Sequence, residues 1–247
     1  MDIEESSPGH RKADRRPFPS RTRVEAPWSY EVDSAETGEA SKRAGRSRRP
    51  AVGREEVARV KKKAQRKRGW IVFQDESGVS QRPPLRRTWS PRGETPVIVH
   101  AFNWKKLSIC AAIAYRWDGN RSRVYFQTVA DSYNDEKLIL FLKDLKRHFR
   151  GTHVIMVWDG LPAHKSGKMK AFLAEQKDWL EAELLPGYSP DLNPVEGLWN
   201  NIKSQELANL PAENLGEVAQ AVNKGFDRVG TYRQLTFGFL DECGLSF

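Results

Sequence analysis

The sequence contains little cysteine and no long hydrophobic run, and these shortages exclude several classes of protein. Its two cysteines, Cys110 and Cys243, lie far apart and cannot form a four-ligand zinc site by themselves, and no histidine pair is spaced to complete one. No stretch approaches the roughly 20 consecutive apolar residues that a membrane span needs. The opening MDIEESSPGH lacks the basic and then apolar pattern of a secretory signal. We therefore expect a protein of the reducing cytoplasm without a membrane segment.

Positive charge is concentrated in the N-terminal part of the 247-residue chain. Residues 1–69 contain 19 Lys and Arg against 11 Asp and Glu, whereas residues 70–247 contain 22 against 21. A basic arm of this kind suits a polyanionic partner, because neutralised phosphates release their counterions. A solvated leader with no partner explains the composition equally well.

The same N-terminal part has the composition of a leader followed by a helix. Residues 1–53 mix Arg, Ser, Pro, Glu and Gly with few aliphatic residues, which predicts a disordered basic arm. Residues 54–68 (REEVARVKKKAQRKR) predict a basic helical arm or linker. One ordered domain is expected over residues 69–247, since eight Trp and a hydrophobic share of 38% in the whole chain can form a core.

Strands and helices alternate in the sequence of this domain. Apolar runs predict strands at 70–75, 107–115, 123–128, 154–158 and 179–185. Helical spacing predicts helices at 134–149, 165–176, 193–207, 214–228 and 231–241. Residues 81–96 contain four prolines and predict a turn-rich excursion. The order predicts an α/β fold with a mixed sheet flanked by helices, the layout of a ribonuclease-H-like domain.

Three acidic residues occupy positions where carboxylates can hold metal ions. Asp75 ends the predicted strand WIVFQD and Asp159 ends VIMVWD, so both are expected at strand ends, where α/β sheets place ligand sites. Glu196 lies in the first turn of the predicted helix that starts at Asn193. Three convergent carboxylates suit two hard cations such as Mg²⁺, and such ions promote phosphodiester chemistry. Glu76 should point to the opposite face of the sheet from Asp75.

Each of these acidic residues also has a purely structural explanation. A strand-end Asp is often only a turn residue. Asn193 and Glu196 match a capping box, in which the glutamate merely accepts the backbone N–H of the cap residue. Helix geometry favours a further role, because Glu196, Asn200 and Lys203 share one polar stripe beside the apolar face.

Four segments, taken in order, carry a family resemblance. They are QDESG at 74–78, RRTWSPRGETP at 86–96, WDGLPAHKS at 158–166 and YSPDLNPVEGLWNNIK at 188–203. Together they resemble the transposases of bacterial insertion sequences in the Tc/mariner superfamily, which are acidic-triad (DDE) endonucleases. The resemblance covers about residues 54–240. It implies a ribonuclease-H-like fold, Mg²⁺ or Mn²⁺ as a two-ion cofactor, and cut-and-paste movement of a DNA element.

The resemblance also assigns roles to single residues. It implies Asp75, Asp159 and Glu196 as the catalytic, metal-binding triad, with 36 residues between the second and the third. Gly160 stands where the family usually has Asn. His164 matches the loop histidine of the family, and either contacts phosphate or steadies the metal-binding loop.

Further polar residues are candidates for DNA contact. They are Lys165, Asn200, Lys203, Arg86, Arg87 and Arg92. The three arginines lie beside Trp89 in the turn-rich excursion, and such a mixture of cations and an aromatic ring can hold DNA or a second protomer. Trp89 equally suits the anchoring of a hairpin to the core, and surface lysines are commonly only solvated.

The implied function is that of a DNA transposase catalytic domain. It would cleave DNA at element ends and transfer the strands into target DNA at TA dinucleotides, acting as a homodimer. Family members carry helix-turn-helix modules ahead of this domain, and residues 1–50 show no such pattern, so an upstream helix-turn-helix protein is an expected partner. Two alternatives stay open: a nuclease of the same fold without strand transfer, and an inactive or partial transposase that only binds DNA.

Overall fold

The computed structural model describes residues 29–32, 49–92, 96–101, 105–187 and 189–246. The strands are β1 (Ser29–Val32), β2 (Trp70–Ser80), β3 (Ile98–Ala101), β4 (Lys106–Arg116), β5 (Ser122–Val129), β6 (Val154–Trp158) and β7 (Leu180–Leu184). The helices are α1 (Arg49–Lys67), α2 (Asp135–His148), α3 (Gly167–Glu175), α4 (Pro194–Gln205), α5 (Leu215–Thr231) and α6 (Arg233–Glu242). Two short 3-10 helices are η1 (Pro162–Lys165) and η2 (Pro190–Leu192).

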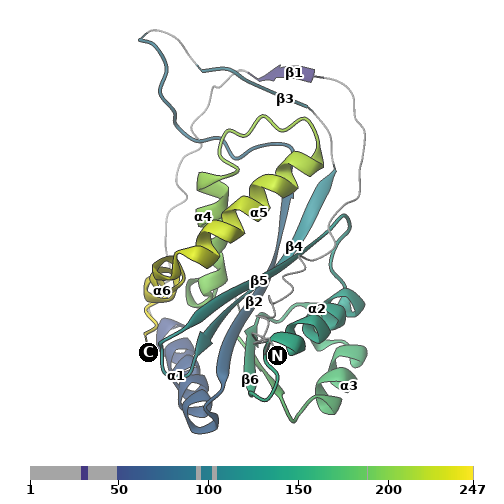
Figure 1. Cartoon of the computed structure of the whole chain (residues 1–247), viewed down its shortest axis with the longest axis vertical. Coiled ribbons are helices and arrows are strands. Elements are labelled where there is room, and N and C mark those ends of the chain that lie inside the picture. The colour runs from purple at the N-terminus through teal and green to yellow at the C-terminus, as the bar shows by residue number, and fades with distance from the viewer. Residues whose placement is uncertain (1–28, 33–48, 93–95, 102–104, 188, 247) are drawn as a thin grey trace, which may run out of the picture.

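A five-stranded mixed sheet forms the centre of the molecule (Figure 1). Its strand order is β5-β4-β2-β6-β7, in which β2, β6 and β7 are parallel and β4 and β5 run antiparallel to their neighbours. Helices α2 and α3 lie in the connections between the parallel strands. The predicted mixed sheet flanked by helices is therefore confirmed.

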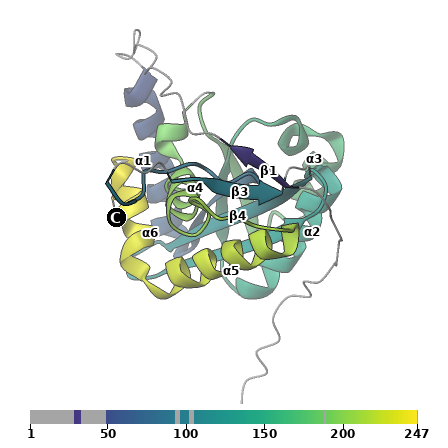
Figure 2. The same ribbon diagram turned by 90° about the horizontal axis from the view of Figure 1, so that it is seen from above.

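Helices cover both faces of this sheet and enclose one apolar core on each side (Figures 1 and 2). Alternation along β2 assigns its side chains to the two cores: Ile71 and Phe73 pack with residues of α1, α4, α5 and α6, whereas Val72 packs with residues of α2 and α3. Consecutive polar residues further along β2 must then face opposite sides as well. This alternation decides where the candidate carboxylates point.

Strand β2 is longer than the sequence predicts, which corrects the placement of Asp75. The prediction ended this strand at Asp75, but β4 pairs with it along its whole length, from Trp70 to Ser80. The extension of β2 beyond Asp75 is not evident from the sequence, because Ser77 and Gly78 do not favour strands. Pairing with β6 stops at Phe73. Asp75 therefore stands inside the strand, just beyond the point where its parallel neighbour ends.

The excursion after β2 is fixed at its start by Asn209, which has a positive φ of 54°. The Asn209 side chain accepts the N–H of Arg86 and donates to its carbonyl, both at 2.9 Å, and its own N–H donates to Pro84 at 3.1 Å. The excursion then leads into β3, which pairs with β1 in a separate two-stranded sheet. Neither of these short strands was predicted.

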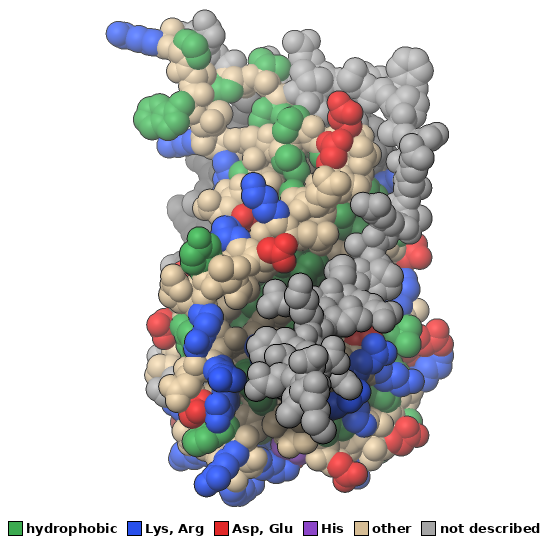
Figure 3. All heavy atoms as spheres, in the orientation of Figure 1, with side chains coloured by type: hydrophobic (Ala, Val, Ile, Leu, Met, Phe, Trp, Pro, Cys, Tyr) green, Lys and Arg blue, Asp and Glu red, His purple; other side chains and the backbone are tan. Residues whose placement is uncertain are grey.

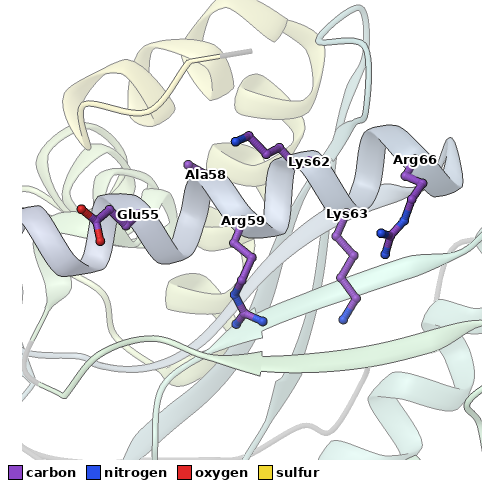
Figure 4. Close-up of a pocket in the computed structure, with 6 residues that line it drawn as sticks. All are labelled: Glu55, Ala58, Arg59, Lys62, Lys63 and Arg66. Atoms are coloured by element: carbon purple, nitrogen blue, oxygen red, sulfur yellow. The ribbon is translucent and has the colours of Figure 1, made fainter.

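Helix α1 covers nearly all of residues 54–68, for which the sequence predicts a basic helical arm or linker. Its buried residues Val57, Val60 and Ala64 belong to the core beneath α4 to α6. Arg59 and Lys63 extend from the helix toward the neighbouring strands (Figure 4), where they form ion pairs with Glu183 of β7 at 3.0 and 2.8 Å. The helix is thus held to the sheet by apolar contacts and by charge.

The predicted disordered leader lies mostly outside the described residues. Within residues 1–53 the structure describes β1 and the first residues of α1. Among the described helices, none is both long and apolar enough to cross a membrane.

Candidate active site

Asp75 lies half-buried on the face of the sheet that α4 covers. Its Oδ2 accepts a hydrogen bond from the indole Nε1–H of Trp199 at 3.0 Å, and its Oδ1 accepts the backbone N–H of Glu76 at 2.9 Å. Burial raises the pKa of Asp75 to about 7; the bond from Trp199 opposes this rise, while the negative charges of Glu196 and Glu76 add to it. Asp75 and Glu196 are therefore close enough to repel each other.

Glu196 stands in the first turn of α4, and its carboxylate is free of the capping role. The Asn193 side chain caps the helix by accepting the N–H of Val195 at 3.2 Å. The backbone N–H of Asn193, which a capping box would pair with Glu196, donates instead to the carbonyl of Pro190 at 3.0 Å. The capping-box explanation of Glu196 is therefore wrong.

Asp159 follows β6 directly, next to the strand that carries Asp75. The last pair of the parallel ladder is Phe73 with Val157, so the two aspartates each stand two residues beyond it on strands about 4.8 Å apart. Asp159 is oriented toward its own loop: Oδ1 accepts the N–H of Leu161 at 3.0 Å and lies 2.9 Å from Nδ1 of His164. The side chain keeps 43% of its surface exposed.

His164 is enclosed behind Asp159, and its side chain has no exposed surface. The ring stacks on Trp158 with the centroids 4.4 Å apart, and its Nε2 lies 3.3 Å from Oε1 of Glu76. Burial alone would lower the pKa of His164, but Glu76 and Asp159 outweigh it and raise the pKa. This enclosed position favours the steadying of the loop over a direct contact with phosphate.

Glu76 points away from Asp75 to the other face of β2, as the alternation predicts. Gln74 on the same face donates to Oε1 of Glu76 at 3.0 Å and to the sulfur of Cys110 at 3.3 Å. These buried contacts connect β2 to the loop after β6 through His164. The motif analysis left Glu76 outside the triad, and the structure agrees in placing it behind the site.

The donor set fits a hard divalent cation, although the carboxylates have not converged. Among the described residues, no group of three His, Cys, Asp or Glu side chains is arranged to hold a metal ion. Asp159 is instead in contact with Leu161 and His164 of its own loop. Burial raises the pKa of Asp75 most, and the negative charges of Glu196 and Glu76 add to the rise. A divalent cation would relieve that repulsion, and its preferred ligands are oxygens.

The other candidates include residues of α4 and of η1. Asn200 and Lys203 follow Glu196 along α4, where Asn200 is exposed and Lys203 half-buried. The amine of Lys165 lies over Gly160, where an added Cβ would come within 2.6 Å of it. A larger residue at position 160 would therefore displace this lysine.

Arg86, Arg87 and Arg92 belong to the excursion between β2 and β3, at the upper left in Figure 1, and all three are exposed. Trp89 between them is 99% exposed. The suggestion that Trp89 anchors a hairpin to the core of this chain is therefore wrong. Basic and hydrophobic side chains project together from this end of the molecule (Figure 3).

Two residues near the carboxylates were not recognised from the sequence. Trp199 was placed on the buried face of its helix, but not in contact with Asp75; its position three residues after Glu196, on a neighbouring part of the same helix surface, was the available signal. Gln74 is 1% exposed within an otherwise apolar strand, and a buried polar residue of this kind commonly has a specific partner.

Fold and site together define an α/β domain with one aspartate within a strand, one directly after the neighbouring strand, and a glutamate at the start of a helix. The model of the DDE superfamily endonuclease family matches residues 70–219, which is more than half of the chain. The chain belongs to this family, as its motifs predict. No curated protein sequence matches it.

Solved structures of the Mos1 mariner transposase share the fold. A paired-end complex with Mn has a TM-score of 0.57 at 19% identity, covering 85% of this chain and 64% of that one. A strand transfer complex has a TM-score of 0.53 at 18% identity, covering 86% and 67%. The catalytic domain with raltegravir and Mg has a TM-score of 0.52 at 20% identity, covering 79% and 90%. The ribonuclease-H-like fold is thereby confirmed, and the chain spans just under two thirds of the first of these proteins.

Proposed function

We propose that this chain is the catalytic domain of a DNA transposase, which cleaves DNA at element ends and joins the strands to target DNA. The observation that carries the proposal is the proximity of Asp75 and Glu196. The half-buried Asp75 of β2 feels the charge of Glu196 at the start of α4, and the capping role of that glutamate is taken by another group. Membership of the endonuclease family supports the same chemistry.

In this proposal Asp75, Asp159 and Glu196 hold two Mg²⁺ or Mn²⁺ ions. Such ions, when bound, activate the attacking oxygen and stabilise the leaving one during phosphodiester cleavage and transfer. The chain itself contributes the positions of the carboxylates: β2 and β6 fix the backbone of the two aspartates, and α4 presents the glutamate. His164 holds the loop from which Asp159 projects.

The proposed partners are element and target DNA and a second copy of the chain. The related structures are paired-end and strand transfer complexes of Mos1, which supports both partners. The exposed Trp89 and its neighbouring arginines offer a surface for either contact. Basic side chains are also frequent at the lower end of the molecule, where α1 lies (Figure 3). An upstream helix-turn-helix protein stays a prediction.

The proposal is tested by neutralising single carboxylates. Asp75→Asn, Asp159→Asn and Glu196→Gln should each lower Mg²⁺-dependent cleavage of element-end DNA by at least roughly 1000-fold, or about 4 kcal/mol of barrier. Glu217→Gln is the matched control, because Glu217 occupies the same position at the start of α5, where its carboxylate accepts the N–H of Glu213 and the side-chain amide of Asn214. Cleavage by a folded Glu196→Gln protein at the normal rate would refute the assignment.

A further inference from the structure

Trp199 makes a contact with Asp75 that its place in the core does not require. The residue lies on α4, three positions after Glu196, and is 4% exposed. Its indole Nε1–H donates to Oδ2 of Asp75 at 3.0 Å, across 124 positions of the sequence. A phenyl ring at this position would bury almost as much apolar surface without that donor.

The carboxylate of Asp75 is held from two sides. Its Oδ1 accepts the backbone N–H of Glu76 within the strand, and its Oδ2 accepts the indole N–H from the helix. A carboxylate offers about four lone-pair directions, so both oxygens keep capacity for a further ligand. The two donors therefore fix the plane of the group without occupying it fully.

The helix that carries the indole is itself closely packed. Gly197 faces Phe239 of α6, where an added Cβ would approach the ring to 3.0 Å. The Trp199 ring meets Phe226 of α5 edge-on, with the centroids 6.1 Å apart and an interplanar angle of 82°. Contacts on both sides leave the indole little freedom to move away from Asp75.

We propose that Trp199 is a positioning residue, which orients the Asp75 carboxylate for metal binding. Helix α4 then contributes twice to the site, by presenting Glu196 and by setting the direction in which Asp75 offers its oxygens. Partners that orient a metal ligand in this way commonly change metal affinity by about 10- to 100-fold. The inference rests on the proposed function, because it requires Asp75 to be a metal ligand.

The substitution Trp199→Phe removes the donor and keeps a ring in the core. Trp179→Phe is a matched control: Trp179 is also buried, and its Nε1–H donates to Gln176 at 2.9 Å, in the core on the other face of the sheet. Titration calorimetry with Mn²⁺ alone should give a dissociation constant about tenfold higher for Trp199→Phe than for the native chain. Trp179→Phe should bind Mn²⁺ as the native chain does, and both variants should unfold at similar temperatures.

The Asp75→Asn protein distinguishes a failure of the positioning role of Trp199 from a failure of the proposed function. If it loses Mn²⁺ binding while Trp199→Phe binds like the native chain, the positioning role is overturned and the proposed function stands. If Asp75→Asn itself binds Mn²⁺ normally, the proposed function fails first.

A measurement on the native chain covers the outcome in which Trp199→Phe does not fold. The indole ¹⁵N–¹H resonance of Trp199, assigned by triple-resonance experiments, should shift as Mg²⁺ saturates the site, while that of Trp179 stays in place. A Trp199 resonance that does not move at saturation would overturn the inference.

Discussion

Helices α4 and α5 begin with the same Asn-x-x-Glu pattern and use its glutamate in different ways. At α5 the Asn214 side chain accepts the N–H of Glu217 at 3.1 Å, and the Glu217 carboxylate accepts from the Asn214 amide and from the N–H of Glu213, both at 3.0 Å. At α4 the corresponding backbone N–H, that of Leu192, donates to the carbonyl of Ser189 at 3.1 Å, and the N–H of Asn193 donates to that of Pro190 at 3.0 Å.

The difference comes from the segment before each helix. The short helix η2 folds back on the start of α4 and provides the acceptor that would otherwise come from the glutamate. A residue pattern alone therefore does not separate a structural carboxylate from a functional one. What separates them is whether the glutamate carboxylate accepts hydrogen bonds at the start of its own helix or is left available for another ligand.

The largest expected effect concerns the ionisation of Asp75, because this carboxyl group is buried beside the start of α4, where the charge of Glu196 adds to the cost of ionising it. Burial, together with the charges of Glu196 and Glu76, raises the pKa of Asp75 from its ordinary value of 3.8 to about 7 in the folded chain. Its contribution to stability is therefore fully present below about pH 3.8 and is lost as the pH rises through about 7. The loss amounts to at most about 4 kcal/mol, before screening by solvent is considered.

Denaturant unfolding in metal-free buffer at several pH values measures this loss. Asp75→Asn should abolish it, so that the variant becomes more stable than the native chain at pH 8. Equal pH profiles for the two proteins would show that neither burial nor the neighbouring charges make the ionisation of Asp75 costly.

A smaller effect compares the two glutamates directly. Glu217→Ala should cost about 1 kcal/mol of unfolding free energy, because it removes two hydrogen bonds from the start of α5. Glu196→Ala should change stability by less than about 0.5 kcal/mol, since the lost helix-dipole interaction is offset by relief of repulsion with Asp75. Equal losses in thermal or denaturant unfolding would mean that both glutamates serve as caps.

The smallest expected effect concerns the cations of α1, some of which form ion pairs within the fold while others do not. Lys63 and Lys67 form ion pairs with Glu181. Burial would raise the pKa of Glu181, but these lysines outweigh it and lower the pKa to about 2. Lys62 and Arg66 are exposed and form no ion pair within the described part of the chain. We therefore expect only the second pair to be available to DNA.

Fluorescence anisotropy of labelled duplex DNA at several salt concentrations tests this division. Lys62→Ala and Arg66→Ala should each lower the slope of log affinity against log salt by about 1. Lys168→Ala, which removes an exposed lysine already paired with Glu136, is the control and should leave the slope unchanged. An unchanged slope in all three would remove α1 from the DNA interface.

Local pattern predicts most of the fold. The buried strands β4 and β6 and the amphipathic helices α2, α4 and α5 all have a clear apolar period, and the structure contains each of them within a few residues. The extension of β2 past Asp75 and the pairing of β1 with β3 depend on partners distant in the sequence. Such pairing leaves little local trace, so these features were not predicted.

For the site, the sequence predicts the carboxylates but not the contacts around them. The motifs identify the family and lead to the three proposed carboxylates, and the strand register explains why Asp75 and Asp159 are neighbours. The indole contact of Trp199 and the enclosure of His164 arise where separate elements meet. Those contacts are three-dimensional, and a single sequence does not encode them as a pattern.

Locating the bound ions tests the central claim most directly. Crystals of the chain grown with Mn²⁺ should give anomalous difference peaks contacted by the carboxylates of Asp75, Asp159 and Glu196, with the Asp159 side chain turned away from Leu161. Peaks confined to other surfaces, or an unchanged Asp159 beside an ion held by fewer of these residues, would contradict the account.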